Sequence, residues 1–212
     1  MSEGAPIAIL DYGMGNLRSV EKAVEHVGGK PLVGCDPAAI RGADGLILPG
    51  VGAFPEAMQR IRARRLDALI GERVAAGAPL LGLCLGMQLL FESSTELGGA
   101  AGLGLLAGEV DALDGGGAKL PHIGWSPLHL EEDSPLSDGI ADAEPFYFVH
   151  SYVARPRPED VLASCEYGER FAAVVGRGRV FGTQFHPEKS SRAGLRMLRN
   201  FVRVATPVSA GA

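Results

Sequence analysis

The sequence predicts an α/β fold, with one domain built on a mainly parallel central sheet, flanking helices and antiparallel additions in its C-terminal half. In the first half of the chain, short all-apolar runs alternate with helical patterns, which is the order expected of parallel strands joined by crossover helices. In the second half, short β-like runs follow one another between turns, as in antiparallel sheets. The 212 residues suffice for one sizeable core.

The first half contains the predicted parallel strands. Residues 6–10 form an all-apolar run, as expected of a strand that is covered on both faces. Apolar residues then recur at helical spacing over 17–27. Further strands are predicted at 32–33 and 45–48. A helix over 60–76, whose charged face we expect to be solvated, leads back to the next strand.

The second half begins with a region rich in glycine and alanine, residues 93–120, in which 114–117 must form a turn. A loop is predicted at 155–158, because its two prolines cannot donate to a sheet ladder. The last helix is predicted over 194–204. Antiparallel strands are expected at 127–130, 145–149, 161–164, 171–175 and 179–184.

Composition and charge exclude several classes of protein. The net charge is −5 at pH 7 and the basic residues are spread along the chain, so we expect no nucleic-acid partner. No apolar run approaches the ~20 residues of a membrane helix, and the N-terminus lacks the pattern of a signal peptide. We therefore expect a cytoplasmic protein without membrane contact, with one domain over 1–205 and a flexible tail over 206–212.

The three cysteines, Cys35, Cys84 and Cys165, are far apart in the sequence and include no C-x-x-C pair. Such spacing indicates neither a disulfide framework nor a cysteine metal site. A reducing compartment is the default for a chain of this kind. We expect no metal and no cofactor.

The stretch from Pro79 to Phe91 resembles a buried strand, a tight turn and a helix, with Cys84 at the turn. Gly82 and Gly86 flank the cysteine two residues away on each side, as in the cysteine version of the G-x-S-x-G nucleophile elbow. Glycine is needed there because strand and helix approach closely and the turn forces the nucleophile toward positive φ. A helix N-terminus also favours the reactive thiolate at such a position. The alternative is a small core cysteine under a glycine-rich turn.

A thiol nucleophile needs a base, and His186 is the best candidate among the five histidines. His26 lies in a helical pattern and His129 in a strand-like run, so both are expected to be surface or packing residues. His186 follows an apolar strand in Phe185-His186-Pro187-Glu188. An extended His-x-Glu places both side chains on one side, where Glu188 can orient the imidazole. The alternative is a strand-end turn with solvent-facing polar residues.

A second loop leaves the strand at 45–48. In Gly50-Val51-Gly52, two glycines bracket Val51, so that backbone N–H groups can approach a ligand without intervening side chains. Loops at the carboxyl ends of parallel strands commonly bind ligands. This segment therefore predicts a donor pair suited to an oxyanion.

Together, Gly82-x-Cys84-x-Gly86-x-Gln88 and Gln184-Phe185-His186-Pro187-Glu188 resemble the class I glutamine amidotransferase family. The resemblance implies a flavodoxin-like fold and a catalytic triad of Cys84, His186 and Glu188. It implies that the enzyme hydrolyses glutamine through a Cys84 thioester, releasing ammonia and then glutamate. It also implies oxyanion donors at the backbone of Leu85 and of Val51 or Gly52, and substrate contacts at Gly50, Gln88, Glu96, Ser151 and Tyr152.

Blocks at 11–20, 48–54, 121–125 and 150–152 resemble the histidine-pathway branch of that family. This resemblance implies a heterodimer with a separate (β/α)8-barrel cyclase, which uses the ammonia to make imidazole glycerol phosphate and an aminoimidazole carboxamide ribotide. Interface positions are then expected at Asn16, Arg18, Pro121, His122, Trp125 and Lys189.

The sequence departs from that branch at Ser126, which replaces the Asn after the tryptophan, and in its Gly/Ala-rich residues 98–118. A buried core position for Trp125 is the alternative to an interface hot spot. Three other functions stay open at this point. They are a glutaminase that serves another acceptor synthase, a cysteine peptidase, and a catalytically silent scaffold with the same elbow.

Overall fold

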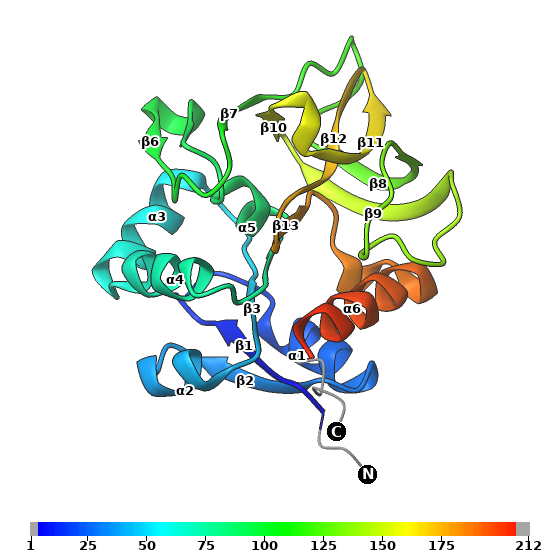
Figure 1. Ribbon diagram of the computed structural model, residues 1–212. Helices are drawn as coiled ribbons and strands as arrows, with labels where there is room; N and C mark the ends of the chain where they lie inside the picture. The colour runs from blue at the N-terminus through cyan, green and yellow to red at the C-terminus, as the bar shows by residue number, and fades with distance from the viewer. Residues whose placement is uncertain (1–3, 207–212) are drawn as a thin grey trace.

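The computed structural model describes residues 4–206, in which a long mixed sheet carries most of the core (Figure 1). Its nine strands lie in the order β2-β1-β3-β4-β13-β12-β11-β8-β9. The strands from β2 to β13 pair in parallel, and those from β13 to β9 pair antiparallel. They are β1 (Pro6–Leu10), β2 (Lys30–Gly34), β3 (Gly45–Leu48), β4 (Leu80–Leu83), β8 (His122–Leu130), β9 (Glu144–His150), β11 (Val161–Tyr167), β12 (Glu169–Arg177) and β13 (Val180–Thr183). The predicted α/β fold is confirmed.

Helices cover both faces of the parallel part of the sheet (Figure 1). In β1, Ile7 and Ile9 join one core cluster with α1 and α6, whereas Ala8 and Leu10 join a second cluster with α2, α3 and α4. This alternation follows from the two-residue period of a strand, so an all-apolar run is required. The helices are α1 (Leu17–His26), α2 (Pro37–Gly42), α3 (Phe54–Ala63), α4 (Leu66–Ala75), α5 (Leu85–Gln88) and α6 (Ser191–Ala205).

The prediction of one continuous helix over 60–76 is wrong. The structure has two helices there, because Arg65 adopts a left-handed conformation with φ 56° between α3 and α4. Helix α2 was not predicted, although Asp36 caps it by accepting from the N–H groups of Ala38 and Ala39. Asp followed by Pro at the first helical position is a recognisable start signal.

A second sheet forms above the carboxyl ends of the parallel strands, in the order β10-β7-β5-β6. Part of the Gly/Ala-rich region is therefore strand rather than loop. The loop predicted at 155–158 is wrong for Arg155 and Pro156, which pair with Glu109 and Gly108. Proline is tolerated because β10 is an edge strand of this sheet. Its strands are β5 (Ser93–Ser94), β6 (Ala100–Ala101), β7 (Gly108–Ala112) and β10 (Tyr152–Pro156).

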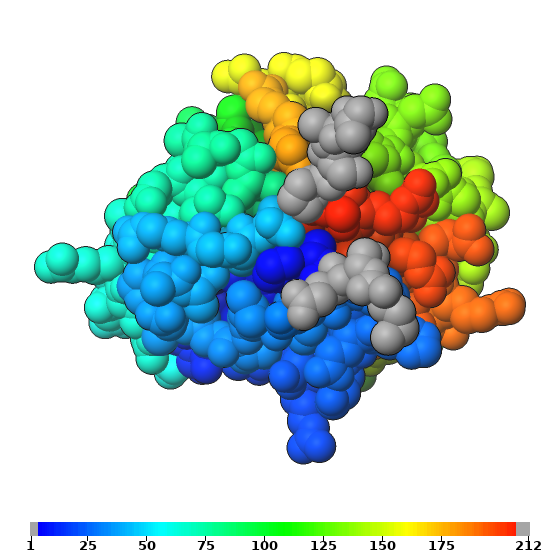
Figure 2. Space-filling view, turned by 60° about the horizontal axis from the view of Figure 1, so that its bottom comes forward, coloured from blue at the N-terminus to red at the C-terminus, as the bar shows by residue number. Residues whose placement is uncertain are grey.

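Helix α6 is longer than predicted and packs beside α1. The blue residues of the first strands and the red residues of α6 lie side by side in Figure 2. No helix within residues 4–206 is long and apolar enough to cross a bilayer. The predicted tail begins at Thr206, which caps α6, and its residues 207–212 lie outside the described part of the chain.

Candidate functional site

Cys84 occupies a strained turn between β4 and α5. Its backbone has φ 53° and ψ −109°, a conformation that side chains rarely adopt and that functional sites often hold. A Cβ on Gly82 would lie 2.5 Å from the carbonyl oxygen of Gly86, and a Cβ on Gly86 would overlap the carbonyl of Leu48. The steric reason given for both glycines is therefore confirmed. Helix α5 is a single turn, so only a few peptide units contribute their dipoles.

His186 and Glu188 follow β13, the strand that pairs in parallel with β4. The Nδ1 atom of His186 lies 2.9 Å from Oε1 of Glu188, and both side chains are buried. Burial alone would lower the pKa of His186, but hydrogen bonds to Cys84 and to Glu188 outweigh it and raise this pKa to about 10. Because Nδ1 is engaged by the carboxylate, Nε2 is the nitrogen that faces Cys84.

Two further groups surround the sulfur of Cys84. Its Sγ donates to the backbone carbonyl of Val149 at 3.7 Å, and Nε2 of Gln184 donates to Sγ at 3.8 Å. Gln184 was not predicted as a site residue. Its place at the start of the 184–188 motif was the available signal, but the sequence alone gives no reason for a Gln side chain to point toward the cysteine.

The Gly50-Val51-Gly52 loop packs directly on the elbow. A Cβ on Gly50 would lie 2.5 Å from the hydroxyl oxygen of Tyr12 and 3.0 Å from the backbone nitrogen of Gly86. The fully buried Tyr12 donates its hydroxyl hydrogen to the carbonyl of Pro49 at 2.8 Å. Burial, and secondarily the charge at Cys84, raise the pKa of Tyr12, so the phenol stays a donor. Sequence reasoning missed Tyr12, because its partner is distant in the chain.

All but one of the predicted substrate residues line one cavity of about 370 Å³ that opens beside Cys84. This volume lies in the range of small-molecule sites. The exception is Gly50, which does not line the cavity. The cavity is lined by Val51, Gly52, Cys84, Leu85, Gln88, Glu96, Pro121, Val149, His150, Ser151, Tyr152, His186 and Lys189.

Gln88 and Glu96 each use part of their hydrogen-bonding capacity within the protein. The Nε2 atom of Gln88 donates to the carbonyl of Tyr152 at 2.9 Å and to Oε1 of Gln184 at 3.0 Å. Glu96 accepts the backbone N–H of Phe54 through Oε2 at 2.8 Å. A ligand can therefore meet Oε1 of each side chain, and both oxygens are acceptors.

The predicted interface residues divide into two groups. Asn16, Arg18, Pro121, Trp125 and Lys189 are exposed, and Trp125 is 53% exposed, which excludes the core position considered for it. The interface position predicted for His122 is wrong, because this residue is only 1% exposed. Successive residues of β8 point to opposite faces, so His122 and Trp125, three positions apart, do not share a face.

Nothing in the described part of the chain brings together three or more His, Cys, Asp or Glu side chains suited to a metal ion. Cys35 is exposed and Cys165 is buried. Among the histidines set aside, His26 is exposed and His129 lies 4.0 Å from Asp142. The chemistry available at the cavity is thus a thiol beside a carboxylate-bound imidazole, which suits nucleophilic attack on a carbonyl or amide carbon.

Comparison with known proteins gives the same family as the sequence motifs. The family model for glutamine amidotransferase class-I matches residues 8–205. An imidazole glycerol phosphate synthase subunit HisH from Moorella thermoacetica is 52% identical over 197 residues, which cover 92% of this chain and 93% of the relative. A subunit of the same name from Methanosarcina acetivorans is 48% identical over 200 residues, covering 93% and 98%.

Solved structures share the fold. The structure of PurLQS from Thermotoga maritima matches with a TM-score of 0.76 at 19% identity and covers 96% of this chain and 100% of that one. A crystal structure of glutamine amidotransferase matches with a TM-score of 0.74 at 22% identity, covering 94% and 98%. The family model and the relatives about 50% identical show that this chain belongs to the class-I glutamine amidotransferase family.

Proposed function

We propose that this protein hydrolyses glutamine to glutamate and ammonia as the glutaminase subunit of an imidazole glycerol phosphate synthase, in histidine biosynthesis. The observation that carries the proposal is that Cys84 and the buried, Glu188-bound His186 line one cavity of small-molecule size. The relatives at 52% and 48% identity bear the name of that subunit.

In the proposed mechanism, Cys84 attacks the side-chain amide carbon of glutamine while His186 holds the thiol proton on Nε2. Collapse of the tetrahedral intermediate breaks the carbon–nitrogen bond, and His186 gives the proton to the leaving amine, which departs as ammonia. Water then attacks the thioester, with His186 as base, and glutamate leaves. Glu188 orients the imidazole and stabilises its charged form, in agreement with their 2.9 Å contact.

The oxyanion is proposed to meet the backbone N–H of Leu85, which follows the nucleophile, and an N–H from Val51 or Gly52. A single donor of this kind is typically worth about 3 kcal/mol of activation free energy. Gln88 and Glu96 offer acceptors to the polar groups of glutamine, and the 151–152 backbone offers contacts to its amino-acid end. All of these residues line the same cavity.

The proposed partner is a cyclase with a (β/α)8 barrel, which forms a heterodimer with this chain and makes imidazole glycerol phosphate and an aminoimidazole carboxamide ribotide. Ammonia released into water would be protonated and would lose its nucleophilicity, so the two active sites must communicate directly. The exposed Ile123 and Trp125 on β8 support an interface next to the cavity, where Pro121 and Lys189 form part of the wall. Exposed aromatic side chains are typical anchors of such interfaces.

The extent of the domain over 1–205 and a cytoplasmic location stay predictions. A glutaminase that serves another acceptor is the nearest alternative, and a cysteine peptidase or a silent scaffold are more distant ones. Mixing the protein with glutamine and candidate cyclases, and measuring which one raises glutamate release, separates these alternatives. A peptidase would cleave peptides and show no response to any cyclase.

The Cys84→Ala variant tests the division of labour. We expect it to abolish the glutamine-dependent cyclase reaction of the reconstituted pair and to leave the ammonia-dependent reaction intact. The matched control is Cys35→Ala, which removes an exposed thiol and should leave both reactions unchanged. Equal loss of both reactions in Cys84→Ala would contradict the proposal.

A further inference from the structure

We infer that Gln184 is a further catalytic residue of this glutaminase, whose side-chain amide donates a hydrogen bond to the sulfur of Cys84 and holds it as a thiolate for attack. The inference rests on the proposed function. Gln184 is fully buried at the end of β13, and its Nε2 atom lies 3.8 Å from Sγ. It does not line the cavity, so it meets the nucleophile from behind.

The direction of this hydrogen bond follows from the backbone carbonyl of Tyr152. A carbonyl oxygen only accepts, so the atom of Gln88 that lies 2.9 Å from it must be the amide nitrogen. The same nitrogen lies 3.0 Å from Gln184, which must therefore present its oxygen. The nitrogen of Gln184 is then left facing Cys84. The orientation of both amides is thus fixed by their partners.

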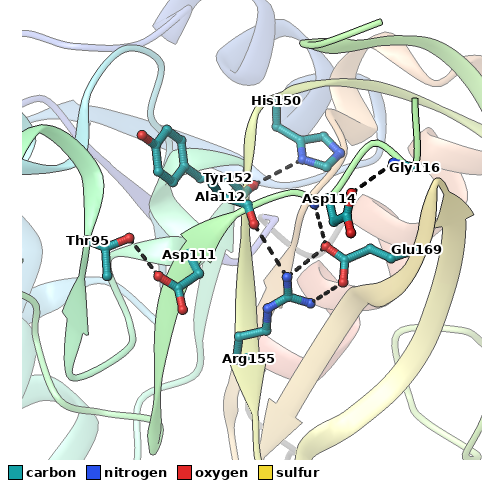
Figure 3. A network of polar contacts seen from close by, with 9 residues as sticks. All are labelled: Thr95, Asp111, Ala112, Asp114, Gly116, His150, Tyr152, Arg155 and Glu169. Carbon is teal, nitrogen blue, oxygen red and sulfur yellow. Dashed lines mark hydrogen bonds and ion pairs between the residues drawn. The ribbon is translucent and has the colours of Figure 1, made fainter. Parts of the chain in front are cut away.

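The carbonyl of Tyr152 is itself held by a second donor, Nδ1 of His150 at 3.0 Å (Figure 3). Burial lowers the pKa of His150 to about 3, so the ring is neutral and its Nε2 accepts. That atom lies 3.0 Å from Nδ1 of His122, whose Nε2 accepts in turn from the hydroxyl of Ser126 at 2.9 Å. The buried side chains of His150 and His122 thereby fix the carbonyl on which the two amides depend.

The two neighbours of the sulfur favour different protonation states. The carbonyl of Val149, at 3.7 Å, accepts the S–H of a neutral thiol and repels a thiolate. The N–H of Gln184 can only donate, so it favours the thiolate. Hydrogen bonds to charged groups are stronger than those between neutral groups. Gln184 therefore offsets the carbonyl and supports the ion pair of the sulfur with protonated His186.

The test removes the donor and measures the thiolate itself. Gln184→Met keeps the length of the side chain without an N–H, and Gln184→Glu keeps the acceptor for Gln88 but places an oxygen toward the sulfur. Both are made in a Cys35→Ser background, because Cys35 is exposed and would react. Gln59→Met is the matched control, since Gln59 is exposed on α3. The rate of alkylation of Cys84 by iodoacetamide is followed from pH 5 to 9 by mass spectrometry.

We expect alkylation at pH 7 to fall about 10- to 100-fold in Gln184→Met, as for the loss of one hydrogen bond to a charged group, and further in Gln184→Glu. The kcat for glutamine should fall in parallel with little change in KM, because Gln184 lies outside the cavity. The Gln59→Met control should match the parent. Folding of each variant is checked by its thermal transition.

Alkylation of Cys84 at the parent rate in the folded Gln184→Met or Gln184→Glu variant would overturn the inference, and only one of the two needs to fold. A merely structural role would change stability without moving the pH profile of alkylation. Because alkylation does not depend on glutamine, a parent protein that alkylates normally but releases no glutamate with any cyclase would reject the proposed function and leave the role of Gln184 testable.

Discussion

Replacement of Gly82 by alanine should disrupt the contact between β4 and α5 on which the elbow depends. An added Cβ would lie 2.5 Å from the oxygen and 2.6 Å from the carbon of the Gly86 carbonyl, and 2.7 Å from the nitrogen of Met87. Real Cβ atoms essentially never come closer than 3.0 Å to such neighbours. All three atoms are backbone, so no side chain can move away, and the strand and the helix must separate.

The separation needed is about 0.5 Å, and a gap of 0.5–1 Å already forfeits a quarter to a half of each dispersion contact. Overpacking of a buried site costs about 1–3 kcal/mol, and the rigid surroundings place Gly82→Ala near the upper half of that range. We therefore expect a loss of about 2 kcal/mol in the free energy of unfolding. For a chain of this size, that lowers Tm by about 4–8 °C.

The matched control is Gly71→Ala in the interior of α4. Nothing lies within 4 Å of the position that its Cβ would take, and alanine is favoured over glycine in a helix by about 0.5–1 kcal/mol. The same substitution should therefore stabilise the protein at Gly71 and destabilise it at Gly82. Urea unfolding gives both values, and glutamine hydrolysis should fall only in Gly82→Ala.

A Gly82→Ala variant as stable as the parent would refute the close approach of strand and helix as the reason for glycine. A Gly71→Ala variant that is destabilised would contradict the expectation that open space at Gly71 accommodates a Cβ. Loss of activity in Gly82→Ala without loss of stability would locate the effect in the elbow conformation alone.

Three further predictions concern buried polar groups. Tyr12→Phe removes the hydroxyl that is hydrogen-bonded to the carbonyl of Pro49. It should lower the free energy of unfolding by about 0.5–1.5 kcal/mol and should also lower kcat. An unchanged kcat would show that Tyr12 does not act on the reaction through the Gly50-Val51-Gly52 loop. The pKa of His186 is raised from 6.5 to about 10, so its stabilising contribution is complete below pH 6.5 and is lost as the pH rises through 10. Glu188→Gln should make the free energy of unfolding, measured with urea at pH 6, 8 and 10, fall less steeply with pH than in the parent. The same pH dependence in variant and parent would contradict the role of Glu188. The buried side-chain amide of Asn200 donates to the backbone carbonyls of Leu136 and Asp138, each at 2.9 Å. Asn200→Leu leaves both carbonyls unsatisfied and should lower the free energy of unfolding by about 1–3 kcal/mol for each. An unchanged Tm would contradict this.

Local patterns in the sequence were enough for the elbow and for the His-x-Glu pair. The spacing of Gly82, Cys84 and Gly86 predicts a strained strand–turn–helix, because Gly82 and Gly86 approach each other within five consecutive residues. The close approach of Gly86 to the carbonyl of Leu48 is not local, and the spacing does not predict it. The contact of His186 with Glu188 is also local, but the extended backbone predicted for this pair is wrong. Only His186 is extended, and Pro187–Lys189 form a 3-10 turn that brings Glu188 within 2.9 Å of the imidazole. The all-apolar run of β1 also sufficed to predict a strand covered on both faces, but it did not predict the order of the strands in the sheet.

Contacts between distant segments could not be read in this way. The register of β8 turns His122 inward and leaves Trp125 exposed, and the sequence offered both residues as interface candidates. The short strands of the Gly/Ala-rich region lie in one sheet with β10, which is distant in the sequence and pairs with β7. The hydrogen bonds of Gln184 and Tyr12 join residues separated by 100 and 37 positions, and no local pattern specifies such partners.

By itself, the sequence singled out Cys84, His186 and Glu188 as the candidate nucleophile, base and orienting carboxylate, because two local motifs together resemble those of a known family. Only the tertiary structure decided that these groups meet. Strand β13 lies beside β4 with Thr183 opposite Leu83, and the N–H of Cys84 donates to the carbonyl of Thr183 at 2.7 Å. Strand order is set by the summed burial of whole elements, and this order brings Gln184 and His186 to the sulfur of Cys84.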